Sequence, residues 1–217
     1  IDSLDNTSYG SVIYDLKGKD AQRKKEIGTA KYSISAKDSH GNSLSEAQRT
    51  FFKDSKAVDK KGNLAVVYHG TNNGGFTVFN RTNNYYTDNA SVADSYTKNN
   101  GIYKGYVNIK NPLVVDAKGN KFSGIPIENI DLDNIQKYAK EYGMSEFIEN
   151  GKLRTSTADI VGLIEDLNDE LNMGYDGVIF RNIYDEGLFG DNNNNKSNVY
   201  VTFNGNQFKN TTNINPT

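Results

Sequence analysis

The sequence predicts an α+β fold, in which helices and strands are mixed along the chain. Short apolar runs typical of buried strands, at 64–68 and 178–180, are interspersed with amphipathic helical segments such as 157–172. They do not follow the regular strand–helix–strand order of a doubly wound parallel sheet. A chain of 217 residues can bury a sizeable core as one domain, or as one domain with an arm.

The N-terminal part of the chain differs in composition from the rest. Residues 1–44 are polar, rich in Lys, Asp, Ser and Gly, and contain one short alternating segment at 30–35. We expect a polar arm or linker there, followed by a domain at 45–217. Within that domain, 45–52 is expected to form a short helix with an acidic first turn. The chain starts at Ile1 rather than at a methionine, so we expect a domain of a longer polypeptide.

The later elements are predicted from capping residues and from hydrophobic periodicity. Asn89, Asp131 and Thr157 are residue types that accept hydrogen bonds from the first turn of a helix, and Gly174 is suited to end one. Alternating or continuous apolar residues predict the strands. The expected helices are 90–98, 131–142 and 157–172, and the expected strands are 64–68, 102–109, 113–115, 178–180 and 199–203.

Composition excludes several classes of function. There are 25 basic and 27 acidic residues, so no general electrostatic attraction to nucleic acid is expected. The chain has no cysteine, which excludes disulfides, thiol nucleophiles and cysteine metal sites. It has two histidines far apart in sequence, so we expect no metal centre. Mean hydropathy is −0.71 and no apolar run is long enough to span a membrane, so we expect no membrane partner.

The most informative motif is a histidine at the end of the first apolar run. His69 follows Tyr68, and the small residues Gly70 and Thr71 come directly after it. Small residues let a ligand approach the backbone closely. A tyrosine-rich segment at 85–86 and Tyr96 follow. Together these residues are suited to hold a flat, polar, ring-bearing ligand.

These residues, in this order, resemble the ADP-ribosyltransferase superfamily, in the diphtheria-toxin and poly-ADP-ribose-polymerase branch that has a His–Tyr–Glu triad. The chain is more closely similar to the ADP-ribosyltransferase domains of phage and mobile-element polyvalent proteins. The similarity covers about residues 44–210 and is carried by motifs in a fixed order. These include Tyr68-His69-Gly70-Thr71, Tyr86-Thr87-Asp88-Asn89, Asn111-Pro112-Leu113, Gly174-Tyr175-Asp176-Gly177 and Asn206-Gln207-Phe208-Lys209.

The resemblance implies both a fold and an activity. The fold would be a cleft between two small, mainly antiparallel sheets with flanking helices. The activity would be transfer of a single ADP-ribose unit from NAD to a macromolecular acceptor, such as a protein, with release of nicotinamide. Alternatives are an NAD glycohydrolase, and a degenerate domain that binds NAD or a protein without turnover. The resemblance suggests a mobile-element effector or toxin that acts in a bacterial cytoplasm after delivery by a phage or mobile element.

The resemblance also implies roles for single residues. His69 would donate a hydrogen bond to a ribose hydroxyl, and the Gly70 backbone would pair with the nicotinamide amide, beside Thr71. Tyr85 and Tyr96 would stack on the two faces of the nicotinamide ring. Further NAD contacts would come from Tyr86 and from Arg81, whose guanidinium suits the pyrophosphate.

One position departs from the polymerase-like pattern. The last strand begins with Val199 where that pattern has a glutamate, and a valine can neither hold a ribose hydroxyl nor stabilise a cation. Gln207 is our first candidate for the third polar residue of the site, and Asp185 or Glu186 is the second. A structural interpretation remains open for each candidate. His69 could be satisfied by a nearby carbonyl, the tyrosines could be core residues, Gln207 could cap the sheet, and Arg81 could lie on the surface.

Overall fold

The computed structural model describes the chain from residue 34 onward. The chain divides into two compact units, 1–33 and 34–217, and every described residue belongs to the second unit. Arg81, the predicted helix at 131–142 and most of the segment at 30–35 lie outside the described residues. The described residues are 34–79, 82–98, 101–125, 148–149, 152–153, 161–162, 164–166, 168–169, 173–188 and 196–217.

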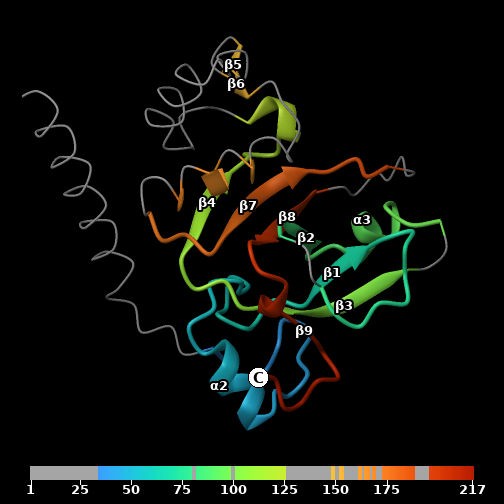
Figure 1. Cartoon of the computed structure of the whole chain (residues 1–217), viewed down its shortest axis with the longest axis vertical. Helices are drawn as coiled ribbons and strands as arrows, with labels where there is room; N and C mark the ends of the chain where they lie inside the picture. Colours follow the sequence, from blue (N-terminus) through green and yellow to red (C-terminus); the bar gives the residue numbers. More distant parts are fainter. Residues whose placement is uncertain are drawn as a thin grey trace, which may run out of the picture. The chain divides into compact units, whose positions relative to one another are not determined.

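The central feature of the fold is one mixed seven-stranded sheet in the order β4-β7-β8-β2-β1-β3-β9 (Figure 1). Neighbouring strands are antiparallel, except that β4 and β7 are parallel. A separate two-stranded pair joins β5 and β6. The strands are β1 (Val67–Gly70), β2 (Asn84–Thr87), β3 (Ile102–Val107), β4 (Pro112–Asp116), β5 (Ile148–Glu149), β6 (Lys152–Leu153), β7 (Gly177–Tyr184), β8 (Lys196–Thr202) and β9 (Phe208–Asn210).

The sheet has a weak seam between β1 and β2. These two strands share one register pair, Tyr68 with Thr87. By contrast, β1 pairs with β3 along its whole length, from Val67 to Gly70, and β2 pairs with β8 along its whole length. The prediction of two separate sheets is therefore not confirmed, because this single pair joins two strand groups into one sheet.

Among the described residues, three hydrophobic clusters pack against the sheet. One contains residues from both sides of the seam, including Val67 and Val107 on one side and Ile179 and Tyr200 on the other. Side chains alternate between the two faces of a strand, so the sequence neighbours of these residues pack into the two other clusters. Val199 and Val201 face a cluster formed with β4, β7 and the helical residues Val161 and Ile164, and Leu64 and Val66 face a cluster with Phe52 and Tyr106.

The N-terminal segment of the described unit is part of the core. Ile34 and Leu44, which we expected in the polar arm, are buried in the cluster with Phe52 and Leu64. The backbone there makes isolated bridges, one of which joins Asp38 and Leu64. These residues therefore pack with the domain, and residues 1–33 form the separate unit.

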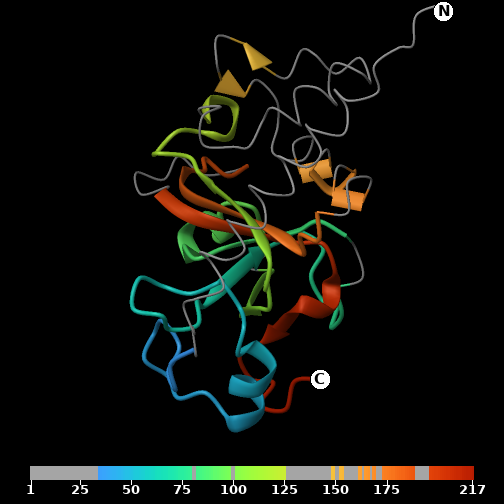
Figure 2. The same ribbon diagram turned by 90° about the vertical axis from the view of Figure 1, so that its left-hand side faces the viewer.

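Helix α2 (Glu46–Phe52) begins with a capping box in which Ser45 and Gln48 bond each other's backbone. The Gln48 side chain also donates to the carbonyls of Thr211 and Asn213, so α2 and the C-terminal segment lie side by side (Figures 1 and 2). This confirms the predicted short helix and adds a contact that its sequence did not indicate.

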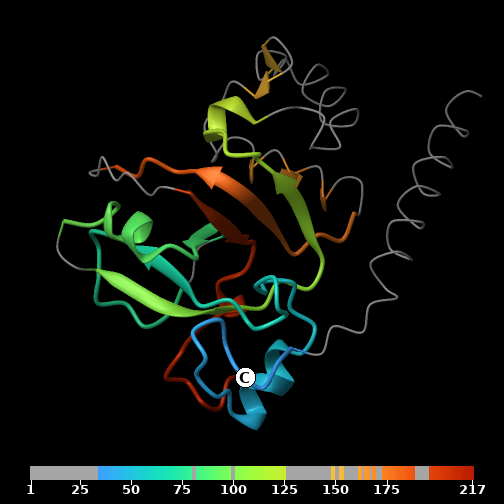
Figure 3. The same ribbon diagram turned by 180° about the vertical axis from the view of Figure 1, so that it is seen from behind.

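Helix α3 (Ala90–Asp94) lies beside β1 and β2, next to the seam (Figures 1 and 3). Its predicted N-cap is confirmed, because the Asn89 side chain accepts a hydrogen bond from the Ser91 N–H at 3.0 Å. The predicted helix at 157–172 is helical wherever its central part is described, at 161–162, 164–166 and 168–169. Among the described helices, none is long and apolar enough to cross a membrane.

Candidate active site

His69 lies where β1 and β2 cease to pair. Its Nδ1 atom lies 2.8 Å from the carbonyl oxygen of Tyr85. A carbonyl only accepts hydrogen bonds, so Nδ1 carries the proton and Nε2 is left as an acceptor in the neutral ring. Burial lowers the pKa of His69, although the bond to Tyr85 opposes this shift. The ring is therefore neutral at neutral pH with Nε2 as an acceptor atom, whereas our expectation for His69 was a donor to a ribose hydroxyl.

Aromatic rings fix the orientation of His69. The Phe79 ring meets it edge-on with centroids 5.2 Å apart, and the Tyr86 ring lies at 5.7 Å. Phe76 stacks on Tyr103 at 4.4 Å, and its N–H donates to the Tyr103 hydroxyl at 3.1 Å. Phe76 and Phe79 therefore anchor the loop after β1 to the core.

Gly70 presents a backbone edge toward β2. The Thr71 N–H donates to the Gly101 carbonyl at 2.9 Å, so residue 71 forms a hydrogen-bonded pair with the chain leading into β3. In an antiparallel ladder these pairs alternate, and the N–H and C=O of Gly70 therefore point away from β3, toward β2. Among the described residues no strand pairs with that edge, since β1 and β2 share only Tyr68 and Thr87. An amide group could bond both Gly70 atoms there.

A glycine is required at position 70 because α3 approaches it closely. A Cβ atom there would lie 1.8 Å from the Ala93 carbonyl oxygen and 3.2 Å from the Cβ of Tyr96. Only a residue without a side chain leaves room for this contact. Tyr96 is thereby placed directly beside the Gly70 backbone.

Tyr96 is bonded to a carboxylate from the end of β7. Its hydroxyl donates to Oδ1 of Asp185 at 2.6 Å, and the Gly187 N–H donates to the same oxygen at 3.0 Å. Asp185 is buried, with 7% of its surface exposed. Burial, and then the charge of Asp185, raise the pKa of Tyr96, so the phenol stays protonated. Both residues were candidates from the sequence, but no sequence pattern linked them.

Tyr85 and Tyr86 are on opposite faces of β2. Tyr85 is half-buried and packs against the cluster that contains Val199 and Val201. Tyr86 is 1% exposed and stacks on Phe208, with centroids 4.9 Å apart. Burial raises its pKa. Tyr86 is thus a core residue, and we no longer assign it a contact with NAD.

Gln207 is bonded on all sides, away from His69. Its Nε2 donates to the carbonyls of Asn108 at 3.0 Å and Asp176 at 2.9 Å, and its Oε1 accepts from the Asn204 N–H at 2.9 Å. His69 pairs with Tyr103 of β3. Asn108 directly follows β3, five residues after Tyr103, which corresponds to about 17 Å at the usual strand rise. Gln207 therefore closes a turn, and we correct our assignment of it as the third polar residue.

The other two candidates differ in their surroundings. Glu186 pairs with Lys121 at 2.5 Å on the surface, where 55% of its side chain is exposed. Val199, which we aligned with the glutamate of the polymerase-like pattern, is 3% exposed and lies between Thr87 and Phe180 in the sheet. Asp185 is therefore the candidate carboxylate that contacts another site residue, Tyr96.

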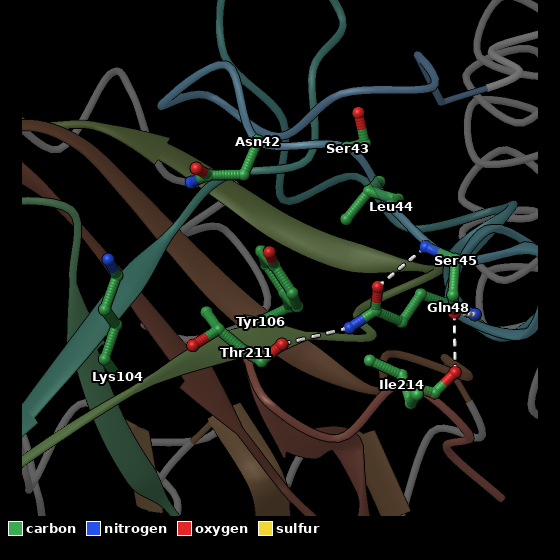
Figure 4. A pocket seen from close by; sticks show the side chains of 9 residues that line it. All are labelled: Asn42, Ser43, Leu44, Ser45, Gln48, Lys104, Tyr106, Thr211 and Ile214. Carbon is green, nitrogen blue, oxygen red and sulfur yellow. Dashed lines mark hydrogen bonds between the residues drawn. The ribbon is translucent and has the colours of Figure 1, made fainter.

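A pocket lies outside this site. It has a volume of about 490 Å³ and is lined by Lys104 and Tyr106 of β3 and by residues 42–45, 48, 211 and 214 (Figure 4). Since side chains alternate along β3, this pocket lies on the face opposite Tyr103 and His69.

No group of three or more His, Cys, Asp or Glu residues that could hold a metal occurs within the part of the chain that the structure describes.

Comparison with known proteins identifies the family of the chain. A family model described as "ADP-ribosyltransferase in polyvalent proteins" matches residues 59–217, and the chain belongs to this family. The match includes β1 with His69, β2, α3, β7 with the following Asp185, and β8 with Val199. Neither the curated proteins nor the solved structures give a match to the chain.

Proposed function

We propose that the domain transfers a single ADP-ribose unit from NAD to a macromolecular acceptor and releases nicotinamide. The observation that carries the proposal is the Gly70 backbone edge between His69 and Tyr96, with which no strand among the described residues pairs, in a chain of the ADP-ribosyltransferase family. A nicotinamide amide has one donor and one acceptor group, which complement the C=O and N–H of Gly70.

In this proposal the residues around Gly70 orient NAD. Tyr85 and Tyr96 contact the nicotinamide ring by stacking, and the Nε2 of His69 accepts a hydrogen bond from a ribose hydroxyl. The glycosidic bond breaks with its electron pair leaving on nicotinamide, and positive charge develops on the ribose. A nucleophile of the acceptor then bonds to the anomeric carbon and loses its proton. Arg81 is kept as a candidate for the pyrophosphate, on the sequence alone.

Val199 supports a second candidate function. A buried valine supplies no carboxylate to stabilise the ribose cation or to orient an acceptor. We therefore expect slow turnover, and a domain that binds NAD or a protein without turnover is the rival. Water as the acceptor would make the domain an NAD glycohydrolase.

Incubation with NAD labelled in the adenosine moiety, in the presence of a bacterial lysate, separates these possibilities. Label in macromolecules supports transfer, and label in free ADP-ribose supports hydrolysis. NAD binding by calorimetry without either product supports a non-catalytic binding domain. If neither NAD nor nicotinamide binds at millimolar concentration, the proposal is wrong.

A further inference from the structure

We propose that Asp185 is a positioning residue, which holds Tyr96 against the Gly70 edge through its hydrogen bond to the Tyr96 hydroxyl. This inference rests on the proposed function, because the ring it positions is the one we assign to nicotinamide. It gives a role to the carboxylate that follows β7, in a domain that has a valine and no carboxylate at position 199 of β8.

A β-bulge brings Asp185 to this position. Phe180 and Ile183 are three residues apart in β7. In a regular strand, two residues that are three positions apart point to opposite faces of the sheet. Both are nevertheless buried in the same cluster, because the register shifts between them. The extra residue is accommodated at Asn182, which has φ +53°. Asp185 follows Ile183 by two residues and therefore lies on the face that also carries Tyr85 and Val199.

The bulge itself is held by side-chain and backbone bonds. The Asn182 side chain donates to Asp116 at 2.9 Å, its N–H donates to the Asn198 side chain at 3.1 Å, and its carbonyl accepts from the Gly119 N–H at 2.6 Å. A bulge fixed in this way gives one register to the end of β7. The register of β7 therefore sets the side of the sheet from which the Asp185 side chain leaves the backbone.

The segment after Asp185 is tied to the end of α3. The Gly187 backbone lies so close to α3 that a Cβ there would be 1.7 Å from the Ser95 hydroxyl oxygen. The Leu188 N–H donates to the Ser95 carbonyl at 3.3 Å. Asp185, Gly187 and Leu188 thus contact Ser95 and Tyr96 together. The position of the Tyr96 ring depends on this contact as well as on the packing of α3 on Gly70.

Among the described residues, the Asp185 carboxylate accepts its two hydrogen bonds at Oδ1. Their donors are the Tyr96 O–H and the Gly187 N–H, and the oxygen of a side-chain amide could accept both bonds as well. A role through Tyr96 therefore depends on an acceptor atom and not on the negative charge. A direct role toward the ribose cation would instead depend on the charge. This difference makes the inference testable with conservative variants.

The test compares NAD binding and nicotinamide release among Tyr96→Phe, Asp185→Ala, their double variant and Asp185→Asn. Loss of a hydrogen bond to a charged group should lower kcat/KM about tenfold or more in each of the first two variants. The double variant should be no worse than the more severe single variant, because both remove the same contact. Asp185→Asn should stay within about threefold of wild type. Glu186→Gln, next in sequence but exposed, is the matched control and should change nothing.

Three results would overturn the inference. These are losses that add in the double variant, single variants with unchanged kcat/KM, and an Asp185→Asn loss as severe as that of Asp185→Ala while Tyr96→Phe stays mild. Thermal unfolding of each variant shows whether a loss reflects misfolding, and Tyr96→Phe is conservative enough to fold. Failure of the wild-type domain to bind or cleave NAD would instead remove the proposed function, and this inference with it.

Discussion

His69 shows how one contact decides the chemistry of a side chain. The Tyr85 carbonyl fixes the proton on Nδ1, and burial favours the neutral ring. The sequence motif identified the residue as part of a site, but the direction of its hydrogen bond to a ligand depends on the tautomer. The tautomer depends on where the Tyr85 backbone lies, and no residue pattern encodes that.

The lowered pKa of His69 predicts a pH-dependent stability. The folded state holds the ring neutral below the ordinary pKa of 6.5, whereas the unfolded chain binds a proton there. The contribution is fully present above pH 6.5 and is lost as the pH falls through the lowered pKa of the folded state. Thermal unfolding measured from neutral to mildly acidic pH should show this loss, and His69→Gln should reduce it.

The second histidine provides the control for that measurement. His40 is exposed, whereas His69 is partly buried. His40→Gln should keep the wild-type dependence on pH. An equal change in both variants would contradict the assignment of the effect to His69.

Gln207 carries a prediction about stability rather than activity. Gln207→Ala would leave the Asn204 N–H and the carbonyls of Asn108 and Asp176 without their side-chain partner. We expect the free energy of unfolding to fall by about 1–3 kcal/mol in denaturant titrations. NAD binding should be retained, and Asn206→Ala, an exposed neighbour, is the control. Loss of NAD binding in a stable Gln207→Ala variant would restore Gln207 to the site.

At the scale of elements, the contact between β1 and α3 depends on a glycine. Gly70→Ala would place a Cβ 1.8 Å from the Ala93 carbonyl oxygen, so α3 would have to move. We expect a loss of about 1–3 kcal/mol in the free energy of unfolding, together with loss of NAD binding. Gly74→Ala is the matched control, since its Cβ would meet Gly101 at 3.8 Å, an ordinary contact. Chemical unfolding and calorimetry check both; equal effects would contradict this account.

The sequence predicted the kind of most elements better than their limits. The apolar run at 64–68 predicted the first core strand, but β1 is Val67–Gly70, and Leu64 instead forms isolated bridges with Asp38 and Val58. The run at 178–180 lies in the first half of a longer strand, Gly177–Tyr184, which continues past a bulge that breaks the alternation. Periodicity cannot reveal such a bulge, and for that reason the link from Asp185 to Tyr96 was not predicted.

At the scale of the whole molecule, the seam between β1 and β2 brings the candidate residues together. The sequence order of His69, Tyr85 and Tyr96 predicted a common site, and the structure places His69 against the Tyr85 backbone and Tyr96 beside Gly70. The failure of Gln207 has the same origin. It follows β8 closely in sequence, but the chain crosses the sheet to β9 and carries it to the other end of β3.

Val199 of β8 gives a prediction about both the stability of the core and the activity of the site. Val199 is 3% exposed in a cluster shared by β4, β7 and β8, so Val199→Glu would bury a carboxylate. We expect the free energy of unfolding to fall by about 3 kcal/mol or more, a large fraction of the 5–15 kcal/mol that is usual for domains. Because the polymerase-like pattern has its glutamate at this position, we also expect faster nicotinamide release per folded molecule.

Val201→Glu separates these two effects. Val201 is fully buried on the same face of the same strand, two residues away, and its replacement should destabilise the fold at least as much. It should not accelerate nicotinamide release, because the pattern has no carboxylate there. Denaturant titration gives the folded fraction, and the release rate is divided by it. If both variants accelerate release equally, or if neither does, the alignment of β8 with the polymerase-like strand is wrong.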